Sequence, residues 1–163
     1  MINLPLLRQI CAAPGVSGYQ QQYRNLAQGF VIDLADEGHI DNMGNLTAIR
    51  RGKEAKRVMV AAHMDEIGFI VNHIDDDGFI RFLPLGGFDP KTLTAQRVIV
   101  HGAQDLVGVM GTKPIHIMKP EERSKAVPMS EYFIDMGMSK EELVKYVGVG
   151  DPITREREMI EIG

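Results

Sequence analysis

The sequence of 163 residues predicts an α/β fold whose N-terminal part is followed by a β-rich part. Residues 4–11 and 18–35 carry apolar side chains at three- and four-residue steps, the spacing of helices that bury one face. Beyond residue 66, short apolar runs alternate with Gly, Asp and Pro turns, which is typical of a small barrel or sandwich. We expect three consecutive segments: 1–66 in an α/β domain, 67–150 in a β-rich domain, and 151–163 leading back toward the first domain.

Residues that start or stop helices delimit the two N-terminal helices. Pro5 is tolerated in a first helical turn, and Pro14 with Gly15 ends the first helix. Ser17 is a candidate N-cap of the second helix, because Gln20 three residues later completes a capping-box pattern.

A hairpin and a buried strand are predicted after the helices. Residues 40–43 and 46–49 flank Gly44-Asn45, a pair that favours a tight turn between two strands. Residues 57–62 are mostly apolar, which predicts a buried strand that ends directly before a polar stretch. Helices and strands in this order are expected to form part of a sheet covered by helices.

Another hairpin opens the β-rich part, at residues 67–74 and 79–83 around Asp75-Asp76-Asp77-Gly78. The three acids lack the spacing of an EF-hand loop and its distal Glu, so we expect a turn rather than a calcium site. Further elements are expected in this order: strands at 97–100, 106–110 and 115–118, an exposed loop at 119–128, a strand at 132–136, a helix at 143–147 capped by Ser139 and Glu142, and a last strand or hairpin within 153–162.

Composition excludes several classes of partner. The net charge is −4 and no face is obviously basic, so we expect neither a nucleic acid nor an anionic membrane as partner. The single cysteine, Cys11, cannot form an internal disulfide, which favours a reducing compartment. The sequence shows neither a signal peptide nor an apolar run of transmembrane length, so a cytoplasmic location is expected.

The polar residues that follow the predicted buried strand are the candidate site. Side chains alternate along a strand, so His63 and Asp65 are expected to project on one side and Glu66 on the other. An imidazole can bind a divalent metal through one nitrogen, and a neighbouring carboxylate can orient the ring. The alternative is a His and an Asp that meet at a strand end without any metal, because two residues alone do not make a metal site.

An ordered series of motifs supports the metal hypothesis. The motifs are GVSG at 15–18, DNMGNL at 41–46, VAAHMDEIGF at 60–69, GG at 86–87, GVMG at 108–111, PIH at 114–116, FIDMG at 133–137 and VGD at 149–151. With these motifs in this order, the sequence resembles the glutamyl and tetrahedral (TET) aminopeptidases, a family of two-metal cytosolic exopeptidases, some of which were once labelled endoglucanases. The resemblance covers nearly all 163 residues.

This resemblance implies an α/β two-metal peptidase domain interrupted by an inserted β-rich, PDZ-like dimerisation domain. It implies that His63 is a ligand of one of two divalent ions, with zinc, cobalt or manganese suited to such ligands. Asp65 would be the catalytic acid that orients the site, peptides would be the substrates, and residues 67–150 would mediate homo-oligomerisation.

The sequence departs from the family in length, since family members continue for about as long again. The missing part would supply the general base and the remaining ligands, so we expect this chain alone to bind metal weakly, to be inactive and to expose apolar surface within residues 1–66. The alternative is a non-catalytic oligomerisation or binding module with a vestigial corner of a metal site. A glycoside hydrolase would need two paired carboxylates, and no pair is singled out.

Overall fold

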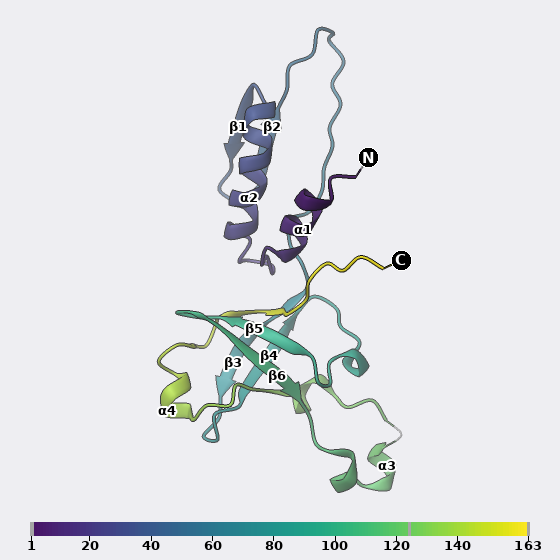
Figure 1. Ribbon diagram of the computed structural model, residues 1–163, viewed down its shortest axis with the longest axis vertical. Coiled ribbons are helices and arrows are strands. Elements are labelled where there is room, and N and C mark those ends of the chain that lie inside the picture. Colours follow the sequence, from purple (N-terminus) through teal and green to yellow (C-terminus); the bar gives the residue numbers. More distant parts are fainter. Residues whose placement is uncertain (1, 124, 163) are drawn as a thin grey trace. The chain divides into compact units, whose positions relative to one another are not determined.

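The computed structural model describes residues 2–123 and 125–162, which divide into two compact units (Figure 1). Residues 66–157 form one of them, the barrel unit. Residues 1–65 and 158–163 make up the other, the N-terminal unit, so the barrel unit is inserted within its sequence. The barrel unit extends past the expected boundary at residue 150, because strand β8 (Pro152–Arg155) pairs inside it.

The N-terminal unit combines two helices with a two-stranded hairpin. Helix α1 (Leu4–Ala12) is capped by the side chain of Asn3, which accepts a hydrogen bond from the backbone N–H of Leu6 at 3.1 Å. Helix α2 (Gln21–Val31) continues into a 3₁₀ turn (Ile32–Leu34). The predicted hairpin is confirmed as β1 (Glu37–Ile40) and β2 (Leu46–Ile49), with the first strand three residues earlier than expected.

The predicted capping box at Ser17 is wrong. Helix α2 begins at Gln21, and the side-chain oxygen of Gln20 accepts from the N–H of Gly18 at 3.1 Å. The hydroxyl of Ser17 instead donates to the carboxylate of Asp65. A charged acceptor makes a stronger hydrogen bond than a neutral one, which favours this partner over a role at the helix start.

The predicted buried strand at 57–62 is also wrong for this chain. In the part of the chain that the structure describes, these residues pair with no other strand, and Val58, Met59 and Val60 are about nine-tenths exposed. A strand is stable only where neighbours satisfy its backbone and cover its side chains. Among the described residues of the N-terminal unit, Val16 is the one buried apolar side chain.

The barrel unit is a closed antiparallel barrel of six strands. They are β3 (Gly68–Ile74), β4 (Ile80–Leu85), β5 (Arg97–His101), β6 (Asp105–Gly111), β7 (Phe133–Asp135) and β8. Their order around the barrel is β3-β4-β7-β6-β5-β8, and β8 returns to β3 with Ile153 opposite Phe69. Closure leaves no sheet edge, and the alternating side chains fill the interior.

Aromatic side chains lie at the centre of this core. Phe69 is fully buried, stacks on Phe88 with ring centroids 4.3 Å apart and meets Phe82 edge-on at 4.9 Å. The other buried apolar side chains of the core are Val71, Ile74, Ile80, Leu93, Val98, Val100, Met110, Tyr132, Ile134, Leu143, Val147 and Ile153.

The segment between β6 and β7 departs from the sequence prediction. The strand expected at 115–118 is a 3₁₀ turn (Ile115–Ile117), and the loop expected after it contains the short helix α3 (Pro120–Arg123). Pro114, whose backbone lacks an N–H, directly precedes the turn as its N-cap residue.

The remaining short elements belong to the barrel unit. They are 3₁₀ turns at Pro90–Thr92 and Met129–Glu131 and the helix α4 (Lys140–Leu143). Ser139 caps α4 as predicted, since its hydroxyl oxygen accepts from the N–H of Glu142 at 3.3 Å, but the helix spans Lys140–Leu143 and not the expected 143–147. Of the helices in the described residues, none has the length and the apolar run needed to cross a membrane.

Candidate metal site

The side chains of His63 and Asp65 lie close together, as their two-residue spacing predicts, although residues 57–62 before them form no strand. The Nδ1 atom of His63 lies 3.0 Å from Oδ1 of Asp65 and 2.9 Å from its carbonyl oxygen. Both of these atoms are acceptors, so Nδ1 carries the proton and donates it. The Nε2 atom forms no hydrogen bond with any described residue, and the side chain of His63 is 84 % exposed.

Ser17 completes the cluster from a distant part of the sequence. Its hydroxyl donates to Oδ2 of Asp65, so the two carboxylate oxygens have different partners. This hydrogen bond from Ser17 is the largest cause that lowers the pKa of Asp65 below its usual value, and His63 lowers it further. The carboxylate is therefore ionised at neutral pH and accepts from both side chains.

This donor set fits one corner of a metal site. An imidazole whose Nδ1–H is held by a carboxylate presents its Nε2 lone pair outward, which is the usual arrangement of a metal-ligating histidine. Among the described residues, no group of three or more His, Cys, Asp or Glu side chains is arranged to hold a metal ion. His63 is therefore a single potential ligand with an oriented ring.

Glu66, the next acid along the chain, has a different partner. Its carboxylate accepts from the guanidinium of Arg157 at 2.6 Å, within the barrel unit. The ion pair gives Glu66 a structural contact away from His63. The other histidine of a family-like motif, His116, lies in the 3₁₀ turn at Ile115–Ile117, where it is exposed.

His101 forms side-chain hydrogen bonds that the residues around it in the sequence do not predict. Its Nδ1 lies 2.8 Å from Oδ1 of Asp105, and its Nε2 lies 2.9 Å from the hydroxyl oxygen of Thr154. These three residues come from β5, β6 and β8, so the network links three strands of the barrel. Thr154 is buried, which closes its hydroxyl to a substrate, and the network is structural.

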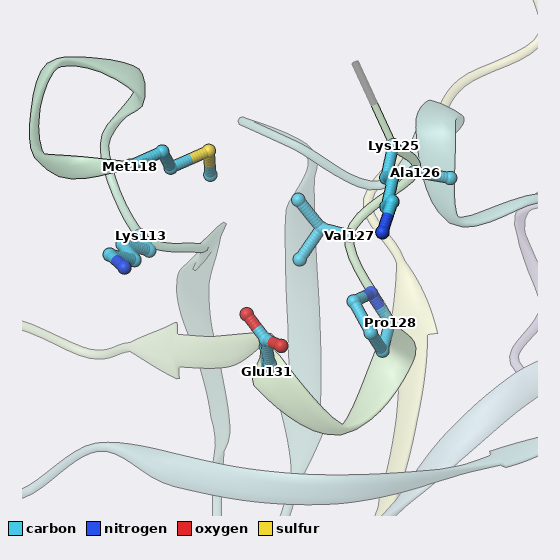
Figure 2. Close-up of a pocket in the computed structure, with 7 residues that line it drawn as sticks. All are labelled: Lys113, Met118, Lys125, Ala126, Val127, Pro128 and Glu131. Carbon is cyan, nitrogen blue, oxygen red and sulfur yellow. The ribbon is translucent and has the colours of Figure 1, made fainter. Parts of the chain in front are cut away.

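A separate pocket of about 190 Å³ lies in the barrel unit (Figure 2). The side chains of Met118, Val127 and Glu131 point toward one another around its open space. Lys113, Lys125, Ala126 and Pro128 complete the lining. A lining with one carboxylate and neither histidine nor cysteine is a poor set of metal donors.

Comparison of the sequence with protein families identifies the family of this chain. The model of the M42 glutamyl aminopeptidases matches residues 44–163, a range that includes His63 and Asp65. The chain belongs to the M42 glutamyl aminopeptidase family. The HMD sequence at 63–65 therefore lies within the part of the chain that matches the M42 family.

Individual M42 relatives agree over nearly the whole chain. The lysyl aminopeptidase of Pyrococcus furiosus is 38 % identical over 151 residues, which are 91 % of this chain and 43 % of that protein. A TET aminopeptidase from a marine sediment thaumarchaeon has a similar structure, with a TM-score of 0.93 at 35 % identity, covering 98 % of this chain and 45 % of that one.

A third M42 relative is described together with its assembly. The Pyrococcus horikoshii TET1 peptidase, which can assemble into a tetrahedron or a large octahedral shell, has a TM-score of 0.81 at 32 % identity. The match covers 94 % of this chain and 46 % of that protein. The chain thus spans less than half the length of the relatives it matches.

Two side-chain contacts in this M42 chain were not predicted from the sequence. Ser17 is 48 positions from Asp65, and its spacing to Gln20 points to a cap instead. The signal that could identify it is the GVSG motif itself, whose two glycines indicate a tight turn that presents the hydroxyl. His101 and Asp105 become neighbours only through the β5–β6 hairpin, in which they are direct partners.

Proposed function

We propose that this chain is the part of an M42 aminopeptidase that supplies His63 as a metal ligand, in an enzyme that removes N-terminal residues from peptides. The observation that carries the proposal is the contact of His63 Nδ1 with the Asp65 carboxylate, which leaves Nε2 for a cation. Asp65 orients the imidazole and holds its proton at Nδ1. Divalent ions, when bound, polarise a peptide carbonyl and activate water for hydrolysis.

The remaining ligands and the general base would come from residues outside these 163. This part of the proposal is supported by the lack of a further ligand group among the described residues and by relatives more than twice as long. The 163-residue chain alone would then bind zinc, cobalt or manganese weakly and leave peptides intact. A free, exposed Cys11 is consistent with action in a reducing, cytoplasmic compartment.

Metal titration and a peptidase assay test this proposal together. Calorimetry with Co²⁺ or Zn²⁺ compares the chain with H63A and with H73A, which removes an exposed histidine of the barrel unit. We expect H63A alone to abolish the weak binding. The intact mass of the natural protein and an assay on aminoacyl-anilide substrates with added metal complete the test. Robust activity of the 163-residue chain would contradict our account of the absent ligands.

We further propose that the barrel unit, residues 67–150 in particular, mediates self-association. Outward-facing Val107 and Val109 on β6 are about half exposed, and Ile99 lies opposite Val107 on the neighbouring strand. Apolar side chains gathered on an outer face favour a protein partner. The assembly stated for the Pyrococcus horikoshii relative makes a second copy the partner of choice.

Sedimentation measures this association directly. Replacing Val107 and Val109 together by Glu should weaken association through this face of the barrel unit, whereas K145E, which reverses a charge elsewhere on the barrel unit, should leave it intact. If the chain retains a stable oligomer and also fails to bind metal, the non-catalytic assembly module becomes the better description.

A further inference from the structure

Ser17 ties the Asp65 carboxylate to a tightly constrained turn. The carboxylate accepts from His63 Nδ1 at one oxygen and from the Ser17 hydroxyl at the other. A carboxylate held at one oxygen can still rotate about its own bond, whereas donors at both oxygens fix its plane. The orientation of the imidazole thus depends on a residue that does not touch it.

The turn that presents Ser17 is restrained on both sides of it. Val16 is 1 % exposed, and its carbonyl oxygen accepts from the N–H of Tyr19 at 2.8 Å. Gly18 has a φ of +89°, a conformation that side chains rarely allow.

Gly15 brings this turn close to the chain segment of the site. A Cβ at Gly15 would lie 3.4 Å from the carbonyl oxygen of Met64, the residue before Asp65, and 3.3 Å from Cβ of Tyr23. The GVSG sequence therefore packs against the backbone that carries the carboxylate, and the Ser17 hydroxyl is delivered from a fixed position.

We propose that Ser17 is a positioning residue of the metal site, which holds Asp65 so that His63 keeps its proton on Nδ1 and its Nε2 lone pair free for a divalent cation. The inference rests on the proposed function for the cation and on the structure for the hydrogen bonds. Residues that orient a ligating histidine through a hydrogen bond raise metal affinity by fixing the tautomer and the ring.

The tautomer of His63 is the primary measurement. Nitrogen-15 chemical shifts of the imidazole, recorded at about pH 8.5 where histidine is neutral, distinguish a proton on Nδ1 from one on Nε2. We expect the unmodified chain to hold the proton on Nδ1. S17A should shift His63 toward the mixed tautomers of a solvated imidazole, and S17T, which restores a hydroxyl, should return it.

Two further variants keep the measurement decisive. S139A removes a serine hydroxyl from the cap of α4 in the barrel unit and should leave His63 unchanged. S17C retains the shape of the side chain with a weaker donor, so it should give an intermediate shift if S17A fails to fold. An Nδ1 proton that persists in both S17A and S17C, or that is absent from the unmodified chain, overturns the proposal.

Metal affinity is the second measurement, and it separates this proposal from the proposed function. With Zn²⁺ as the probe, S17A should weaken binding by about tenfold or less, since the hydroxyl acts through Asp65. S17T should recover most of that loss. If H63A binds Zn²⁺ as well as the unmodified chain, the proposed function fails, whereas the tautomer shift in S17A still supports the positioning of His63 by Ser17.

Discussion

Phe69 in the barrel unit and Phe30 in the N-terminal unit carry the same side chain in different surroundings. Phe69 is fully buried between two other aromatic rings, whereas Phe30 on α2 is 36 % exposed. The barrel strands satisfy one another and enclose a core, while the N-terminal unit leaves the apolar segment around Val60 uncovered. The contrast teaches that the candidate metal site lies on the less well packed of the two units.

Truncation of these two phenylalanines should show the largest difference between the units. F69A should destabilise the barrel unit by about 3–5 kcal/mol, because it removes a fully buried ring and leaves a cavity. F30A should cost the N-terminal unit about 1–2 kcal/mol, since its ring is only partly buried. Native-state hydrogen exchange reports each unit separately, and equal losses would contradict the comparison.

Glycines in the β3–β4 and β1–β2 hairpin turns offer a second matched pair. Gly78 and Gly44 both have positive φ, near +87° and +85°. A Cβ at Gly78 would also lie 2.5 Å from the carbonyl oxygen of Met138, whereas at Gly44 it would meet only the flexible side chain of Arg24.

We expect G78A to be more destabilising than G44A, because the added Cβ would contact rigid backbone at Gly78 and a flexible side chain at Gly44. G78A should cost about 2–4 kcal/mol, and G44A about 1 kcal/mol from backbone conformation alone. Urea unfolding followed by circular dichroism measures both variants. A larger loss in G44A would show that the Arg24 side chain cannot move aside.

The exposed apolar segment of the N-terminal unit should matter for association more than for stability. V60K should change the free energy of unfolding by about 0.5 kcal/mol or less, because Val60 is almost fully exposed. It should also reduce concentration-dependent association, since it interrupts a run of three exposed apolar side chains. V149K, at a single exposed valine of the barrel unit, is the control and should leave association unchanged.

The smallest expected effects concern pH. Hydrogen bonding to Lys140 at 2.6 Å lowers the pKa of Asp76, and the same bond raises the pKa of Lys140. A lowered carboxyl pKa stabilises the fold above the unfolded value near 3.8 and loses this effect as the pH falls through the folded pKa. A raised lysine pKa stabilises below 10.5 and loses its effect as the pH rises through the folded value.

D76N should therefore lower the urea midpoint slightly between about pH 4 and pH 10, with the difference vanishing at both extremes. Asp41 in the N-terminal unit has its pKa lowered by the side chain of Asn45 and by backbone N–H groups, none of which titrates. D41N should accordingly lose its difference at acid pH only. These assignments would be contradicted if the difference in urea midpoint for D41N also vanished at alkaline pH, or if the difference for D76N persisted there.

Local sequence patterns correctly predicted those structural features that depend on residues close together in the sequence. The Asp-Gly turn located the β3–β4 hairpin, Ser139 located the start of α4, and the two-residue spacing placed His63 beside Asp65. Each of these features is determined by residues within a few positions of one another, where turn geometry and side-chain alternation apply.

Other features depend on distant partners, which local patterns do not specify. The apolar run at 57–62 indicated a buried strand, but burial requires strands on either side, and the described residues supply none. Ser17 donates to an acceptor far along the chain, and Thr154 reaches His101 only because β8 pairs with β5.

The pairing of β8 with β3 also constrains the order of folding. Phe69 lies on the first strand of the barrel to be synthesised, and its partner Ile153 lies on the last. Until Ile153 emerges from the ribosome, one edge of β3 lacks its partner strand β8, and the aromatic cluster around Phe69 stays uncovered on that side. Such long-range closure slows folding, and the nascent barrel is expected to depend on protection from aggregation until its final strand arrives.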